Sequence, residues 1–233
     1  MQKPAPALKF LNLASALLLL VSTALAFGYA PREVTMGEVQ RIFYFHVPSA
    51  WVGMLAFGVT FAAAIAYLRT GDRRWDRLGL ASVEIGLVFT VMAAASGSIW
   101  ARPAWNTWWT WDPRLVTFTI MALLYVAYLM LRQSLEDPER QMRFAAVYAI
   151  VAFVSVPITF LSIRWWRTIH PVVIGSNSPT AEGGFDMTAP MRLTFFFSLF
   201  TFTVFYATLL WNRIRLARLA ERVEALKVRL LSA

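Results

Sequence analysis

The chain has 233 residues, of which 58% are hydrophobic and 15% are charged. Soluble domains carry about 25% charged residues, so this chain lacks the polar surface that would keep so apolar a protein in water. It has no Cys, which excludes disulfides, zinc-thiolate sites, iron–sulfur clusters and a thiol nucleophile. Any metal or cofactor would therefore be held by nitrogen or oxygen ligands.

Six stretches are apolar and near the length of about 20 residues that a membrane-spanning helix needs. They are residues 10–30, 47–68, 78–99, 115–131, 144–163 and 191–211. We predict an all-α fold with six transmembrane helices in a single membrane domain, residues 1–233, and a kink in the fifth span at Pro157. The first stretch is longer than the core of a signal peptide, so we predict that it is a retained span.

The distribution of basic residues predicts the orientation. The N-terminus, the loops 69–77 and 132–143 and the tail 212–233 together hold 15 of the 22 Lys and Arg residues. Because short cytoplasmic loops are enriched in Lys and Arg, both termini are predicted to be cytoplasmic. This topology explains the net charge of +9 without a nucleic-acid partner. In the tail, Leu and Val recur at helical spacing, which predicts an amphipathic helix on membrane lipids or a cytoplasmic subunit.

Eight of the ten Trp residues lie on the predicted outer side, and five of them lie in the loop 100–114, WARPAWNTWWTWDPR. Trp105, Trp108, Trp109 and Asp112 have helical spacing, which predicts a short helix between the prolines at 103 and 113 with these residues on one face. Five indoles expose about 750–1,250 Å², more than an ordinary apolar patch of about 300–600 Å². Lipid headgroups, or a large flat ligand such as a porphyrin, a quinone or a polycyclic lipid, could cover them.

The two His residues narrow these candidates. His46 precedes the second span and His170 follows the fifth, so both are predicted to lie outside the spans on the Trp-rich side. A single loop His is usually a solvated or capping residue, but neutral imidazole is also a good ligand of haem iron. Residues 35–38 have the spacing of a capping box, which predicts a short interfacial helix that presents His46. We expect haem to lie against the Trp rings with one His above it and one below.

Charged residues complete the expected site. Four Arg residues on the outer side could pair with haem propionates or with lipid headgroups, namely Arg41, Arg102, Arg114 and Arg167. Glu84 is the clearest charge inside a span, where a charge is costly, so it is expected to face the bundle interior or a partner helix.

At these residues the sequence resembles a known family. The tract WARPAWNTWWTWD resembles the WWD signature of haem-handling proteins. Together with RIFYFHVPSAW before the second span and RWWRTIHPVV after the fifth, it makes the whole chain resemble the haem exporter protein C family of the system I cytochrome c maturation machinery. The chain departs from the family tract at Ala101 and Asn106, where Gly is expected and where a side chain would stiffen the loop.

The resemblance implies a site and a function. His46 and His170 would be the axial iron ligands of a non-covalent b-type haem. The remaining implied haem-binding residues are Trp100, Trp105, Trp108, Trp109, Trp111, Asp112, Arg41 and Arg114. The protein would bind haem at the outer face of the bacterial inner membrane and transfer it to a periplasmic haem chaperone during c-type cytochrome biogenesis.

The resemblance also implies partners. They are an ABC-type ATPase subunit, a second multispan membrane subunit and a small single-span subunit. The chain has no P-loop motif, so it is expected to be a haem-binding subunit and not an enzyme.

Three alternatives remain open at this point. A membrane cytochrome b-type or quinone-reactive oxidoreductase would hold its haem ligands on helices at depth. A system II haem synthetase would have further His residues inside the spans. A plain multispan transporter with an aromatic belt would leave the pair of His residues unexplained.

Overall fold

The computed structural model describes residues 5–172 and 187–231, and every regular element in them is a helix. Six helical segments are long and apolar enough to cross a membrane, which confirms the predicted all-α fold with six spans. The elements are α1 (Pro6–Ala24), a π-helical turn η1 (Leu25–Tyr29), a 3-10 turn η2 (Glu38–Ile42), α2 (Phe43–Thr70), α3 (Arg73–Trp105), α4 (Pro113–Gln133), α5 (Pro138–Phe153), α6 (Ser155–Trp165) and α7 (Ala189–Leu231).

The spans extend beyond their apolar centres because polar residues cap them. Asp72, Asp112 and Asp137 precede α3, α4 and α5, and each accepts a hydrogen bond from a backbone N–H in the first turn of the helix that follows. A side chain that accepts such a bond satisfies one of the unpaired N–H groups at a helix start. A Pro at the first position of α4 and of α5 favours the same start.

Residues 38–46 are helical, as predicted, but the predicted capping box and the separation of this helix from the second span are wrong. The Glu33 carboxylate accepts the backbone N–H groups of Thr35 and Met36, and Gly37 then turns the chain with a φ of 62°. The chain continues through η2 directly into α2, with no side-chain cap on η2. His46 therefore lies in the first turns of a spanning helix and not in the loop before it.

The fifth span is broken between α5 and α6 at Val154. Pro157 has no N–H to donate to the carbonyl four residues earlier, at Phe153, and its ring crowds that carbonyl. Since Phe153 is the last residue of α5, the structure confirms the predicted kink.

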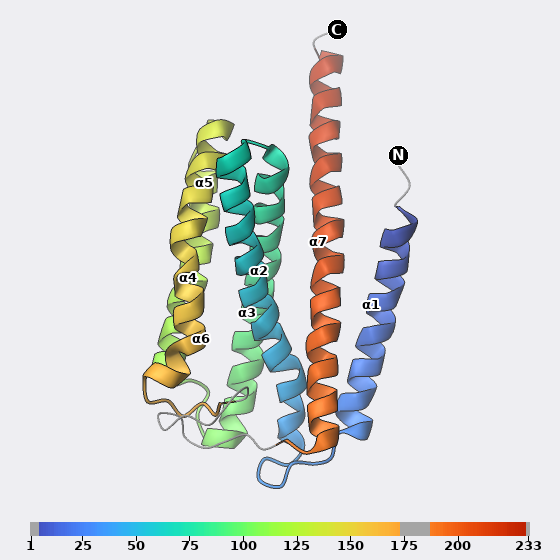
Figure 1. The fold of residues 1–233 in the computed structure, drawn as a ribbon, viewed down its shortest axis with the longest axis vertical. Coiled ribbons are helices and arrows are strands. Elements are labelled where there is room, and N and C mark those ends of the chain that lie inside the picture. The colour runs from blue at the N-terminus through green and yellow to red at the C-terminus, as the bar shows by residue number, and fades with distance from the viewer. Residues whose placement is uncertain (1–4, 173–186, 232–233) are drawn as a thin grey trace.

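The antiparallel helices α2 and α3 form the centre of the molecule, with α4, α5 and α6 on one side and α7 followed by α1 on the other (Figure 1). α2 and α3 approach closely because a small residue stands at their contact: a Cβ on Gly86 would lie 2.9 Å from the Cβ of Ala56. Next to Ala56, the Phe57 ring stacks on Tyr125 of α4 with 3.5 Å between ring centroids. α1 is held to α7 through small polar pairs, Ser15 with Thr208 and Ser22 with Ser198.

Ion pairs tie the helices together at the end of the bundle where the termini lie. Arg132 at the end of α4 pairs with Asp76 of α3 at 2.5 Å, and their side chains are only 8% and 12% exposed. Glu84 of α3 pairs with Arg213 of α7 at 2.6 Å. Glu84 therefore faces a helix of its own bundle, as expected from its position in a span.

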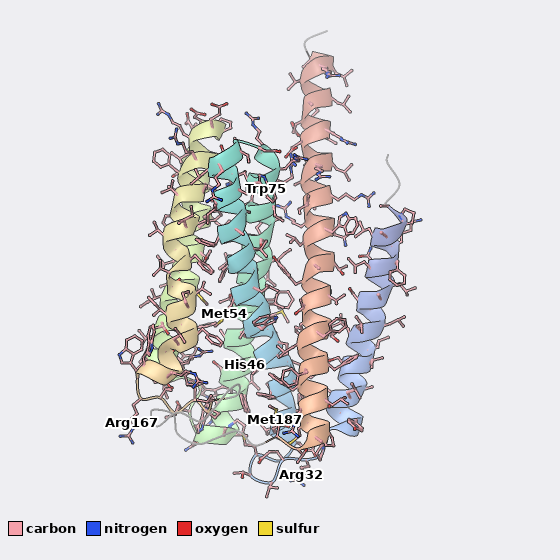
Figure 2. All side chains as sticks on the ribbon, in the orientation of Figure 1. Arg32, His46, Met54, Trp75, Arg167 and Met187 are labelled. Carbon is pink, nitrogen blue, oxygen red and sulfur yellow. The ribbon has the colours of Figure 1, made fainter. Side chains whose placement is uncertain are left out.

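The two ends of the molecule differ. The termini lie at one end, while the connections from η1 to η2 and from α3 to α4 lie at the other (Figure 1). His46 and Arg167 lie toward the end with these connections, and Trp75 lies toward the opposite end (Figure 2). Which side of a membrane each end faces remains a prediction.

The tail is the continuation of α7, which runs unbroken to Leu231, so the predicted helix is confirmed up to that residue. The last two residues of the predicted tail, 232 and 233, lie outside the described residues. Its apolar side chains at Leu216, Val223, Leu226 and Leu230 are 49–78% exposed.

Candidate functional site

His46 on α2 is oriented by the backbone of α3. Its Nδ1 atom lies 3.0 Å from the carbonyl oxygen of Ala93 and 3.2 Å from the Ser96 hydroxyl. A carbonyl can only accept, so the geometry assigns the proton to Nδ1 and leaves Nε2 as the free nitrogen. The ring lies directly over Gly97, where an added Cβ would be 2.8 Å from the His46 Cε1 atom. α3 therefore supplies both the hydrogen-bond acceptor and the space for the ring.

His170 is oriented by a carboxylate. Its Nδ1 atom lies 2.9 Å from Oδ2 of Asp112, and the same oxygen accepts a hydrogen bond of 2.8 Å from the Thr168 hydroxyl. Oδ1 of Asp112 caps α4 by accepting from the Leu115 N–H at 3.0 Å. Burial opposes ionisation of Asp112, but hydrogen bonds from His170, Leu115 and Thr168 outweigh it and lower the pKa of this carboxyl to about 2. Among the described residues, the Nε2 atom of His170 has no hydrogen-bond partner, so it can bind a ligand.

Both His residues line one pocket, whose walls combine small and aliphatic residues with four Trp residues. Its aromatic and basic lining includes Trp100, Trp105, Trp108, Trp109 and Arg114. A row of neighbouring rings connects the two imidazoles: His46 lies 5.8 Å from Trp100, Trp100 lies 6.2 Å from Trp105, and Trp105 lies 5.3 Å from His170, measured between centroids. The structure thus brings together residues that are 124 positions apart in the sequence.

The predicted short helix between the prolines at 103 and 113 is wrong. α3 continues through Pro103 to Trp105 and ends at Asn106, which has a φ of 56°. Near a helix end a proline removes only one of the last hydrogen bonds, so α3 tolerates it. Asn adopts a left-handed conformation more readily than most residues, which explains how Asn106 occupies a position where the family resemblance leads us to expect Gly. The loop that follows carries Trp108 and Trp109 to the pocket without a helix.

Three of the implied haem-binding residues lie outside this pocket lining: Asp112, which holds His170 from behind, Trp111 and Arg41. Trp111 is 72% exposed and meets the edge of Trp109. Arg41 pairs with Glu38 at 2.5 Å and donates to the carbonyls of Ala26 and Ala30, so it holds the connection between η1 and η2. Arg114 does line the pocket, and it donates to the carbonyls of Thr159 and Phe160 on α6.

Sequence reasoning missed the residues that orient the two rings. They are Ala93, Ser96 and Gly97 beside His46, and Thr168 beside His170. The one local signal was the pair of small residues Ser96 and Gly97 inside an apolar span, since such residues permit a close approach of another group.

Three buried donors of the pocket wall have no hydrogen-bond partner among the described residues: Trp100 Nε1, Trp109 Nε1 and Thr110 Oγ1. A buried donor without a partner is unfavourable, which favours a ligand that carries acceptors. Two free imidazole nitrogens, flat apolar walls and the guanidinium of Arg114 suit a planar metal complex with acidic substituents.

Comparisons with known proteins point to one family, whose name refers to heme. The family model described as "Heme exporter protein C" matches residues 2–229. Heme exporter protein C of Bradyrhizobium diazoefficiens is 32% identical over 199 residues, covering 85% of this chain and 74% of that protein. The protein of the same name from Escherichia coli K12 is 33% identical, covering 88% and 81% of the two chains. The one from Haemophilus influenzae is 31% identical, covering 94% and 86%.

Proposed function

This chain belongs to the haem exporter protein C family, and on that premise we propose that it holds haem between His46 and His170 and passes it to a periplasmic haem chaperone. It is a multi-pass membrane protein with a role in haem handling for cytochrome c biogenesis. Haem is the cargo of this chain and not a resident cofactor. The family match favours this role over an oxidoreductase, a system II haem synthetase or a plain transporter.

The proposal is carried by one observation: the protein holds both imidazoles through the same ring nitrogen. Each ring has its Nδ1 atom engaged by the protein, by Ala93 in one case and by Asp112 in the other, so each presents Nε2. Histidines that bind metals are commonly oriented in this way through their other nitrogen. They are the only two His residues in the chain. In the proposed site they bind the iron of a b-type haem from its two faces, without covalent attachment.

The pocket has a volume of about 80 Å³. Pockets for small organic ligands usually measure about 300–1,000 Å³, so we propose that the loop 106–112 moves outward when a macrocycle binds. Trp108 is already 59% exposed, which makes it the wall residue best placed to move with that loop. A site that opens in order to bind also opens in order to release, as the delivery of a cargo requires.

The remaining residues have proposed positions around the cargo. Trp100, Trp105, Trp108 and Trp109 contact the faces and edges of the macrocycle, and Arg114 pairs with a propionate. We assign Arg41 to the loop contact with Glu38 and Trp111 to the exposed surface outside the pocket lining. Asp112 positions His170.

We place the protein in the bacterial inner membrane with both termini in the cytoplasm and the pocket at the periplasmic face. The proposed partners at that face and in the membrane are the haem chaperone, a second multispan subunit and a small single-span subunit. An ABC-type ATPase subunit on the cytoplasmic side would supply the energy for release.

The proposed ligands can be tested by spectroscopy. The protein is expressed in membranes, purified in detergent and compared with the variants His46→Ala, His170→Ala and the double variant. We expect the low-spin two-histidine spectrum to be absent from all three variants, because each single variant retains one axial ligand at most. An unchanged spectrum in the double variant would overturn the ligand assignment.

The proposed Trp wall is tested by a matched pair of variants. Trp109→Ala removes an indole of the pocket, whereas Trp111→Ala removes a neighbouring indole that is 72% exposed and outside the pocket lining. We expect Trp109→Ala to retain several-fold less haem per protein and Trp111→Ala to behave like the wild type. Equal retention in both variants would contradict the proposed wall. The haem-loaded chaperone, measured with and without the ATPase subunit, then separates binding from delivery.

A further inference from the structure

A groove opens between α1 and α7 at the end of the molecule opposite the Trp-lined pocket. The two helices lie side by side near Ser22 and Ser198 and separate toward the termini (Figure 1). Next to the groove, and among the described residues, the Asn212 side-chain amide donates a hydrogen bond of 2.8 Å to the Asn12 side-chain oxygen. The groove has a volume of about 510 Å³, within the range of pockets that hold organic ligands.

The lining of the groove is apolar at one level and basic at the next. Its apolar and aromatic part consists of Ala5, Leu8, Tyr206, Ala207, Leu210, Trp211 and Ile214, while Leu219 lies among the Arg residues. Its basic part consists of Arg215, Arg218 and Arg222, whose spacing of three and four places them on one face of α7. No Asp or Glu belongs to the described lining.

This order along α7 matches the order of groups in a membrane lipid. Tyr206 lies about 14 Å from Arg215 along the helix, at 1.5 Å per residue. Trp211 lies between them, and Trp is enriched where the hydrocarbon meets the headgroups. The apolar part of the groove is therefore at the depth of acyl chains, and the three guanidinium groups are at the level of phosphates.

We propose that the α1–α7 groove binds an anionic phospholipid, with its phosphate on Arg215, Arg218 and Arg222 and an acyl chain along Ala207 and Leu210. Arginine binds phosphate through paired N–H donors, and basic pockets between transmembrane helices are suited to anionic headgroups. The lipid would fix the terminal half of α1, whose outer face is largely exposed, with Phe10 at 72% and Leu13 at 61%. This proposal does not depend on the haem site.

The test uses the full chain purified from membranes and reconstituted in nanodiscs of phosphatidylcholine, with or without phosphatidylglycerol. The groove variant is R215Q/R218Q/R222Q. The control variant R73Q/R140Q/R143Q removes the same number of charges from exposed positions of α3 and α5 that are outside the groove. Retained phosphatidylglycerol is measured by mass spectrometry, and the thermal midpoint Tm is measured in both kinds of disc.

We expect the wild type and the control to retain phosphatidylglycerol and to gain several degrees of Tm from it. The groove variant should retain at least fivefold less and gain nothing. Ala207→Phe, which fills the apolar part and keeps all three Arg residues, should also lose the retained lipid. Circular dichroism of the variants shows whether each has folded.

Three results would overturn the proposal. Equal losses in the groove and control variants would show a general effect of charge. An equal gain of Tm from inorganic phosphate in pure phosphatidylcholine would show a site for free anions. A polypeptide that co-purifies in place of lipid and is lost only in the groove variants would show that a partner helix occupies the groove.

Discussion

The two imidazoles of the pocket differ in what holds them: His46 donates to a backbone carbonyl, and His170 donates to the carboxylate of Asp112. A carboxylate makes the opposite nitrogen of the ring a stronger donor to a metal than a neutral carbonyl does. In the proposed site His170 is therefore the stronger axial ligand. His46 is the ligand that gives way first when the haem leaves.

Asp112→Asn tests this role. The variant keeps the size of the side chain and an oxygen that can cap α4, but it removes the charge next to His170, so we expect haem affinity to fall about 10–100-fold. Affinity is measured by haem titration followed by absorbance. Asp137→Asn is the matched control, because Asp137 also caps a helix that starts with Pro. Equal affinity in the two variants would show that Asp112 serves only as a cap.

Gly97→Ala tests the space beneath His46. The added Cβ would lie 2.8 Å from the ring, so the imidazole must tilt away from its position over α3. We expect a weakened or lost two-histidine spectrum at normal protein abundance. Gly58→Ala is the control, since the nearest neighbour of its added Cβ lies at 3.8 Å. A wild-type spectrum for Gly97→Ala would contradict the proposed position of the ring.

The lowered pKa of Asp112 predicts a dependence of stability on pH in the cargo-free protein. Because the folded pKa, about 2, is below the ordinary value of 3.8, the ionised carboxylate stabilises the fold above pH 4. This contribution is lost as the pH falls from about 4 to about 2. Tm measured in detergent across this range should fall more steeply for the wild type than for Asp112→Asn. Parallel profiles would rule out this contribution.

At the scale of helices, apolar runs predict the centres of the six spans but not their ends. The ends are set by caps such as Asp72 and Asp137, whose effect depends on local hydrogen bonds and not on hydropathy. Spacing alone also predicted a helix at 103–113, where Asn106 ends α3. The Trp residues share a pocket there because a loop folds back, which no helical period describes.

In the site, too, the sequence predicts some features and not others. The pair of His46 and His170 could be predicted because the chain has no other His and because topology places both at one end. The contacts of His170 with Asp112 and of His46 with Gly97 could not. They join residues 58 and 51 positions apart, and only the packing of α2, α3 and the loops brings these together.

The ion pair of Asp76 and Arg132 makes a prediction at the same scale. Both side chains are nearly buried, so removing one partner leaves an uncompensated charge. We expect Arg132→Gln to destabilise the protein by about 3–5 kcal/mol, and the double variant Asp76→Leu, Arg132→Leu to recover most of that loss. Tm in detergent measures both. A stable single variant would show that the pair is solvated.

At the scale of the whole molecule, the two ends carry different chemistry. The Trp-lined pocket lies at one end, and the basic groove of α1 and α7 lies at the other. The haem role and the lipid proposal therefore concern opposite faces of the membrane, and variants at one end should leave the other function intact.

The absence of Cys allows a direct test of orientation. Thr35→Cys places a thiol in the connection before η2, and Ser134→Cys places one in the connection between α4 and α5. An impermeant maleimide should label position 35 in intact spheroplasts, and position 134 only after permeabilisation. The reverse pattern would put the pocket on the cytoplasmic side.

α4 is anchored at both ends by acidic side chains. At one end Asp112 caps the helix and holds His170, and at the other Asp76 of α3 holds Arg132. The 21 residues of α4 form a rod of about 30 Å, at 1.5 Å per residue. A push on one end of such a rod displaces the other, so a force on Arg132 would act on Asp112 and through it on His170, the proposed iron ligand. The Trp-lined pocket is therefore mechanically coupled, through α4, to the opposite end of the bundle.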